Sequence, residues 1–242
     1  MEHDEGKVVR GGQLRLEDAS ALVAAAHELK SPLVLIRQLA FAAGSQDSSP
    51  EERQHILEQL SLVADRGLRL TTDLTKTVRL EDSLFELEPV NAQQLCESIV
   101  KQIAPLYEQY GRKIQITMQR SRPLVLAHRE LLGSVIYHFA DNALHYGDSN
   151  GSVRVSLSTR MAEKRLRIGV RDEGPAMSLR EWRAARDKLG GTLATRPQAS
   201  GLGLYITEQF SRVMNGETGL IRHRNGVTFY IDLPVSEQLS LL

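Results

Sequence analysis

The chain has 242 residues, with 30 Lys and Arg balanced by 30 Asp and Glu, so its formal net charge is zero. That length fits one large domain or two small ones, and 41% apolar residues allow a packed core rather than wholesale disorder. The balanced charge gives no electrostatic footprint for nucleic acid, and the single cysteine, Cys96, excludes an internal disulfide or a cysteine-rich metal site.

Residues 1–13 form a tail of mixed charge without a signal-peptide pattern. No run in the chain approaches the roughly 18 uninterrupted apolar residues that a membrane helix requires. We therefore expect a cytoplasmic chain without a membrane segment, or the soluble part of something longer.

A hairpin of two helices is predicted over residues 14–82. In the first helix the apolar positions alternate spacings of four and three, which indicates a heptad seam. These positions are Leu22, Ala26, Leu29, Leu33, Ile36, Ala40 and Ala43. Turn formers then break the pattern, and Ser49 before Pro50 is typical of an N-cap that starts a second helix. The seam of that helix consists of Ile56, Leu60, Val63, Gly67, Leu70 and Leu74.

Further apolar residues lie off the two seams and indicate a second face to be buried. They are Val23, Leu39, Leu57 and Leu68. Pairing of two hairpins into a four-helix bundle would cover this face. We therefore predict a homodimer that forms through residues 14–80.

Residues 83–236 change to short strands alternating with helices. Strands are expected at 85–89, 114–118, 124–127, 153–159, 166–171, 218–222 and 227–233, and helices at 91–110, 129–146 and 202–214. Residues 173–200, rich in Gly, Pro, Arg and Ala, are predicted to form a long loop that acts as a lid, and residues 237–242 a C-terminal tail. The chain is predicted to be α+β, with the helical hairpin followed by an α/β sandwich whose helices cover one face of a mostly antiparallel sheet.

His27 lies on the first predicted helix, next to a seam position, so its side chain is expected to face solvent. A neutral imidazole nitrogen is a competent nucleophile at pH 7 and must lose a proton as it attacks, which the adjacent Glu28 can accept. Ser31 lies one helical turn further, on the same face, where it can position a water for the reverse, hydrolytic step. Pro32 removes a backbone donor and bends the helix locally. An exposed histidine on an ordinary coiled-coil helix is the alternative interpretation.

Asn142, His145 and Tyr146 share one face of the predicted helix 129–146. The amide oxygen of Asn142 can ligate Mg²⁺, which prefers hard oxygen donors, and His145 can donate a hydrogen bond to a phosphate. The alternative is a polar stripe on a surface helix.

Two glycine-containing loops follow. Asp172 and Gly174 come directly after a strand, where the carboxylate can accept a hydrogen bond from an adenine amine and the glycine lets backbone approach a flat base. Gly201 and Gly203 lead into a helix, where backbone N–H groups can bind phosphates. Each loop alone is a weak signal, and neither has the lysine of a Walker loop.

Together, these segments resemble the sensor histidine kinases of two-component systems over residues 14–234. The resemblance pairs His27–Pro32 with the H box, Asp141–Tyr146 with the N box, Asp172–Gly174 with the G1 box, Gly201–Leu204 with the G2 box and Gly226–Phe229 with the final glycine-threonine element. It implies a dimerisation and phosphotransfer hairpin over 14–82 and a Bergerat-type ATP-binding domain, shared with gyrase and Hsp90, over 83–236.

The resemblance also implies ATP and Mg²⁺ as cofactors, autophosphorylation at His27 with Glu28 and Ser31 assisting, and transfer to an aspartate of a response regulator, with Ser31 serving regulator dephosphorylation. Nucleotide contacts would come from Asn142, which also holds the metal, and from His145, Tyr146, Asp172, Gly174, Gly201, Leu202, Gly203, Leu204 and Thr228.

The chain departs from the family pattern in the nucleotide site rather than in the H box. His138 replaces the first N-box asparagine, His145 the usual lysine or arginine, Ala176 a G1 glycine and Ala199 a G2 glycine. The lid also lacks its usual phenylalanine, since Trp182 is the only aromatic between residues 177 and 195. Two alternatives therefore stand beside the kinase: a scaffolding dimer with weak or no ATP chemistry, and a phosphotransfer protein that uses His27 alone.

Overall fold

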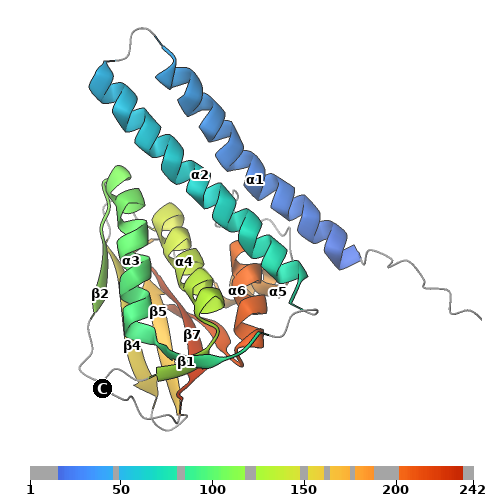
Figure 1. The fold of residues 1–242 in the computed structure, drawn as a ribbon. Coiled ribbons are helices and arrows are strands. Elements are labelled where there is room, and N and C mark those ends of the chain that lie inside the picture. The colour runs from blue at the N-terminus through green and yellow to red at the C-terminus, as the bar shows by residue number, and fades with distance from the viewer. Residues whose placement is uncertain are drawn as a thin grey trace, which may run out of the picture.

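Two long helices form a hairpin at the start of the described chain (Figure 1). The computed structural model describes residues 16–45, 49–80, 85–117, 124–147, 152–160, 164–174, 178–187 and 202–236. Helix α1 spans Leu16–Ala43 and helix α2 spans Pro50–Val78. No helix in these ranges is long and apolar enough to cross a membrane.

A capping box starts α2 where the sequence predicted it. The Ser49 side chain accepts from the Glu52 amide at 3.1 Å, and the Ser49 amide donates to the Glu52 carboxylate at 2.8 Å. These two bonds satisfy backbone donors that the first turn of a helix leaves unpaired, and Pro50 needs no such partner.

The predicted seam of α1 is wrong at three of its positions. Ala26, Leu33 and Ala40 are exposed, whereas Ala25 and Pro32 are buried. The physical reason lies on α2, where Gly67 has no side chain: a Cβ there would lie 3.8 Å from the Pro32 ring. This gap admits the proline ring and turns its side of α1 toward α2. The predicted seam residues of α2 are all half-buried.

The remaining elements alternate between strands and helices. They are β1 (Glu88–Asn91), α3 (Ala92–Gln109), β2 (Ile114–Thr117), β3 (Leu124–Ala127), α4 (Arg129–Tyr146), β4 (Val153–Arg160), β5 (Arg165–Arg171), α5 (Leu179–Asp187), α6 (Leu202–Val213), β6 (Glu217–Arg222) and β7 (Val227–Pro234). Strand β1 begins later than predicted because its register is set by pairing with β3, from Glu88 opposite Ala127 to Asn91 opposite Leu124.

Five strands form one sheet in the order β2-β4-β5-β7-β6. Strands β2 and β4 are parallel, and the other neighbours are antiparallel. Helices α3, α4 and α6 lie against this sheet, and the hairpin leans on their outer side (Figure 1). The α+β fold class predicted from the sequence is confirmed.

The core lies between the sheet and its helices. Its largest fully buried side chains include Tyr107, Phe139, Ile168, Phe210 and Phe229. The rings of Phe139 and Phe229 stack at 5.9 Å between centroids, which joins helix α4 to strand β7. Helix α4 is therefore held firmly, and one of its faces is left for the site.

The loop predicted over residues 173–200 is wrong for Leu179–Asp187, which form helix α5. Ser178 and Glu181 make a capping box at its start, with bonds of 2.9 and 3.2 Å. Trp182 is buried, and its ring lies 5.5 Å from that of Phe229. A lone aromatic thus anchors the helix to the core. Residues 175–177 and 188–200 of the predicted lid lie outside the described residues.

Candidate functional site

A small cleft of about 80 Å³ lies between the hairpin and the sandwich domain. Its described lining comes from α1, α2, α4 and the start of α6, and consists of Glu28, Ser31, Pro32, Arg66, Arg69, Leu70, Tyr137, His138, Asp141, Asn142, His145, Tyr146 and Gly203. Segments far apart in the sequence therefore meet here, and three of the five predicted motif segments, those paired with the H, N and G2 boxes, contribute to one cavity.

On the hairpin side, Glu28 is half-buried and Ser31 exposed, and both line the cleft. Buried Pro32 packs against Gly67, so this part of α1 lies close to α2. His27 is exposed, as the sequence predicted, and is not among the described residues that line the cleft. Glu28 and Ser31 of the motif thus line the cleft, whereas His27 is exposed outside its described lining.

On the domain side, α4 places Asn142, His145 and Tyr146 at the cleft. The apolar residues of this helix recur at helical spacing. The helix begins after the N-cap His128, whose side chain accepts from the Leu131 amide. The buried Nδ2 atom of Asn142 has no hydrogen-bond partner among the described residues. A half-buried amide with an unused donor fits a ligand that carries acceptors, such as a phosphate.

Asp141 joins the two sides of the cleft. Its carboxylate accepts from the Arg66 guanidinium of α2 at 2.9 Å and lies 3.4 Å from His145 on its own helix. Burial alone would raise the pKa of Asp141, but the charges of Arg66 and His145 outweigh burial and hold the pKa well below its usual value. Asp141 is therefore a permanent anion at neutral pH.

Asp172, at the end of β5, is fully buried. Its carboxylate accepts from the Gly174 amide at 3.1 Å and from the Val227 amide at 3.4 Å, so the side chain has a fixed orientation. Gly226 has φ +105°, and a Cβ there would lie 1.9 Å from the Asp172 carbonyl oxygen. Only glycine fits this approach of two backbone segments.

Gly174 also has a packing role that the sequence did not predict. A Cβ at this position would lie 2.3 Å from the Tyr146 carbonyl oxygen. The glycine therefore brings the loop after β5 against the end of α4, rather than only opening room for a flat base. This contact joins the G1-like and N-box-like segments.

The G2-like residues divide into two groups. Leu202 and Leu204 are buried in the core and anchor the first turn of α6, so their side chains point away from the cleft. Gly203 lines the cleft and faces His138: a Cβ on Gly203 would lie 3.5 Å from the Nδ1 atom of that imidazole. Gly201, Ala199 and Ala176 lie outside the described residues.

Thr228 on β7 is buried, and its hydroxyl lies 2.8 Å from the Nε2 atom of His223. The sequence named Thr228 as a nucleotide contact but did not name His223, because five residues and a turn separate the pair. The cleft lining does not include Thr228.

His138 is the largest surprise of the site. Its Nε2 atom lies 2.9 Å from the Asp73 carboxylate on α2, and Ser134 donates to the other oxygen of that carboxylate at 2.8 Å. Burial alone would raise the pKa of Asp73, but its hydrogen bonds with His138 and Ser134 lower the pKa below its usual value. The sequence flagged His138 only as a departure, and it offered no signal for Asp73 or Ser134.

Residues 127–237 match the family described as "Histidine kinase-, DNA gyrase B-, and HSP90-like ATPase". The sensor protein kinase PmrB of Pseudomonas aeruginosa is 29% identical over 199 residues, which cover 81% of this chain and 41% of PmrB. The adaptive-response sensory kinase SasA of Gloeothece citriformis is 26% identical over 235 residues, which cover 92% of this chain and 59% of SasA. The chain thus spans about half the length of these relatives.

Among solved structures, full-length ShkA in complex with AMPPNP has a similar fold. The TM-score is 0.59 at 22% identity, and the match covers 93% of this chain and 47% of ShkA. The match therefore covers both the helical hairpin and the sandwich domain of this chain.

Proposed function

We propose that this chain, which belongs to the sensor histidine kinases of two-component systems, transfers the γ-phosphoryl group of ATP to His27 and passes it on to an aspartate of a response regulator. We also propose a hydrolytic activity, removal of the phosphoryl group from the regulator by water. The observation that carries the proposal is the shared cleft, in which Glu28 and Ser31 of the hairpin face Asn142 and Gly203 of the ATPase-like domain. The kinase would act as a homodimer through the hairpin.

The residues of the domain side fit ATP with Mg²⁺. Bound Mg²⁺ would neutralise charge on the phosphate oxygens. The unused amide donor of Asn142 supports its assignment as a phosphate contact, while its amide oxygen would be the atom that holds the metal. The fixed carboxylate of Asp172 supports its assignment to the adenine amine. His145 and Tyr146 would contact phosphates, and the start of α6 at Gly203 would offer its backbone amides.

In the proposed transfer, one ring nitrogen of His27 forms a bond to the γ-phosphorus while the bond from that phosphorus to the β-γ bridging oxygen breaks and ADP leaves. The proton of the other ring nitrogen passes to Glu28. Most of the rate enhancement would come from positioning and charge neutralisation. In the proposed hydrolysis Ser31 would position a water whose oxygen bonds to the phosphorus of the regulator's aspartyl phosphate, while the bond from that phosphorus to the aspartate oxygen breaks and inorganic phosphate leaves.

Incubation with γ-labelled ATP tests the nucleophile. The full chain should acquire acid-labile label, and His27→Ala should acquire none. His55→Ala is the matched control, because His55 is likewise an exposed histidine on the hairpin and contacts only Gln59 among the interactions described for it. Label that persists in His27→Ala would refute the assignment.

A second candidate function, a scaffolding dimer with an inactive nucleotide site, is favoured by one observation. His138 stands where the family has its first N-box asparagine, and it is engaged by Asp73 instead of being available to a nucleotide. Calorimetry with ATP·Mg at millimolar concentration separates the two functions, since the scaffold predicts no binding heat and the kinase a saturable isotherm. Phosphorylation of His27 by a phosphorylated regulator, without ATP binding, would support the third reading, a phosphotransfer protein.

A further inference from the structure

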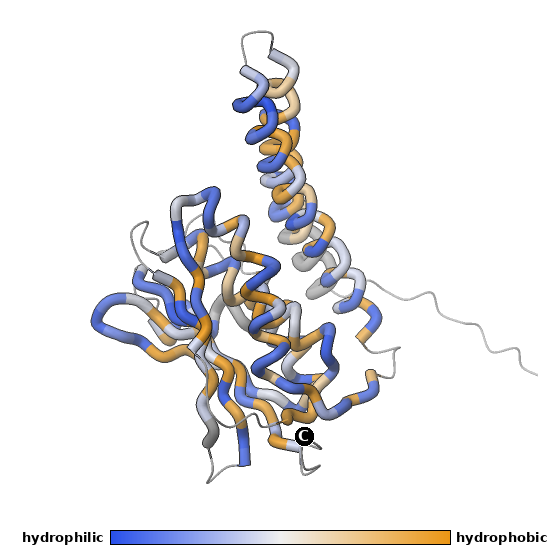
Figure 2. Tube along the Cα trace, turned by 60° about the vertical axis from the view of Figure 1, so that its left-hand side comes forward, coloured by the Kyte–Doolittle hydropathy of each residue, from blue (hydrophilic) through white to orange (hydrophobic). Residues whose placement is uncertain are grey.

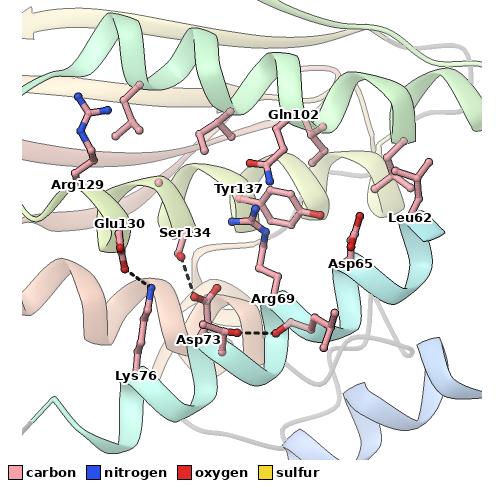
Figure 3. A pocket seen from close by; sticks show the side chains of 17 residues that line it. Leu62, Asp65, Arg69, Asp73, Lys76, Gln102, Arg129, Glu130, Ser134 and Tyr137 are labelled. Atoms are coloured by element: carbon pink, nitrogen blue, oxygen red, sulfur yellow. Dashed lines mark hydrogen bonds and ion pairs between the residues drawn. The ribbon is translucent and has the colours of Figure 1, made fainter. Parts of the chain in front are cut away.

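Helices α2 and α4 face each other through a ladder of polar side chains, of which Figure 3 shows the part from Arg69 to Lys76. The rungs, in order along α2, are Arg66 with Asp141, Arg69 over the ring of Tyr137, Asp73 with Ser134 and His138, and Lys76 with Glu130. Residue numbers increase from rung to rung along α2 while those of their partners on α4 decrease. On each helix the rungs are three or four residues apart, which is the spacing of one helical face. Two antiparallel helices from different parts of the fold are thus matched residue by residue.

The rungs differ in how far water reaches them. Asp73, Ser134 and His138 are 1%, 4% and 7% exposed. The outermost pair ends in Glu130, whose side chain is 68% exposed, so water screens it. A buried carboxylate is costly unless both its oxygens are paired, and Asp73 uses one oxygen for Ser134 and the other for His138. The central rung therefore depends most strongly on the two helices remaining in contact.

A groove of about 610 Å³ runs beside this ladder, between α2, α3 and α4 (Figure 3). Leu62 on α2 and Ile99 on α3 lie on its walls, with charged Asp65 and Arg129. The hairpin and the domain are therefore not sealed together by continuous apolar packing on this side. A contact of mostly polar side chains next to an open groove is typical of parts that can separate.

The contact between α2 and α4 also determines which residues of the hairpin line the cleft. With α2 held on α4, Glu28 and Ser31 face Asn142, while His27 is exposed outside the described lining of the cleft. The imidazole of His27, the proposed nucleophile, is therefore not among the described groups that line the cleft with Asn142.

We propose that Asp73, Ser134 and His138 form a latch that holds the ATP-binding domain on α2 with His27 turned away, so that the latch must open before the phosphoryl group can be transferred. The inference rests on the proposed function for its catalytic consequence. The replacement of the N-box asparagine by His138 thereby gains a physical reason: the histidine is long enough to bridge two helices, and it is used to regulate the domain rather than to bind ATP.

Asp73→Ala tests the latch, with Asp65→Ala as control, because Asp65 is an exposed aspartate on α2 at the same groove. Autophosphorylation at saturating ATP should accelerate on the order of tenfold in Asp73→Ala, the usual size of a coupling between two states. KM for ATP should stay within about twofold, because the latch controls how the domain docks on α2 and is not one of the proposed nucleotide contacts. The control should match the unaltered chain in both quantities.

A second readout needs no ATP. Spin labels at Gln54→Cys and Glu108→Cys, both exposed, report the distance between hairpin and domain. The native Cys96 is buried and does not label readily. With labelled chains diluted by an excess of unlabelled chain, so that distances within one chain dominate, pulsed measurement should give one narrow distribution in the parent chain and a broader one when Asp73→Ala is added. If Asp73→Ala does not fold, Ser134→Ala and His138→Gln take its place.

The outcomes are separable. An unchanged distance distribution in all three latch variants would overturn the latch. A broader distribution with a slower or unchanged rate would overturn its inhibitory role. If the parent chain binds ATP but no variant acquires label on His27, the proposed kinase function fails while the distances still decide whether the latch exists.

Discussion

The hairpin and the sandwich domain bury their apolar residues in opposite ways. In the domain the large side chains of the core are almost completely covered by the sheet and its helices. On the hairpin Val23, Leu33, Phe41 and Leu68 are 61 to 75% exposed. Figure 2 shows hydrophobic residues along both helices of the hairpin, including the end that extends beyond the domain. The difference teaches that the domain completes its own core, whereas the hairpin needs a further surface to cover it.

The largest expected effect concerns the core. Phe139→Ala removes a fully buried ring that stacks on Phe229, and it should lower the free energy of unfolding by about 3–5 kcal/mol. Phe41→Ala on the hairpin removes a ring that is 75% exposed and should change the stability of the domain little. Urea titration followed by the fluorescence of Trp182, the only tryptophan, measures both. Equal losses in the two variants would remove the contrast between the regions.

The next effect is on assembly. Leu33→Asp places a charge on an exposed apolar position of the hairpin, and it should weaken the predicted homodimer by roughly 100-fold, because a buried unpaired carboxylate costs several kcal/mol. Leu179→Asp, at a 52% exposed leucine of the domain, is the matched control. Sedimentation velocity should give one chain for the first variant and two for the second. A dimer that survives Leu33→Asp would place the interface elsewhere.

Acid should weaken the contact between the hairpin and the sandwich domain. Burial alone would raise the pKa of Asp141 above its ordinary value of 3.8, but Arg66, His145 and His138 together outweigh burial and hold the pKa below that value. A carboxyl of this kind stabilises the folded chain above the unfolded-state pKa, and the stabilisation is lost as the pH falls further through the folded-state pKa. We expect a loss of about 1–3 kcal/mol between pH 5 and pH 2. Asp141→Asn should flatten this part of the stability profile measured by urea unfolding, and an unchanged slope would contradict the pairing.

Local patterns predicted much of the fold, and contacts between distant residues account for what they missed. The bounds of α4 were predicted because its pattern is periodic from Arg129 to Tyr146. The seam of α1 was misplaced because the fit of Pro32 against Gly67 depends on a second helix. Asp73 and His138 lie 65 residues apart, and no spacing along a chain indicates that two such residues pair. The motif residues of the site were recognisable, but the cleft that joins them was not.

Helix α5 shows a local signal that was present and overlooked, and it gives the smallest predicted effect. Ser178 and Glu181 have the spacing of a capping box, the same signal that correctly started α2 at Ser49. Ser178→Ala should destabilise α5 by about 1 kcal/mol, because the Glu181 amide loses its acceptor. Local fraying would expose Trp182, so its fluorescence should be quenched more readily by acrylamide. Ser49→Ala removes the equivalent cap from the hairpin and should leave that quenching unchanged, because α2 begins in the other region of the molecule. Equal quenching in the two variants would mean that loss of the hairpin cap exposes Trp182 in the domain as well. The hairpin and the domain would then be coupled more tightly than the open groove beside their contact implies.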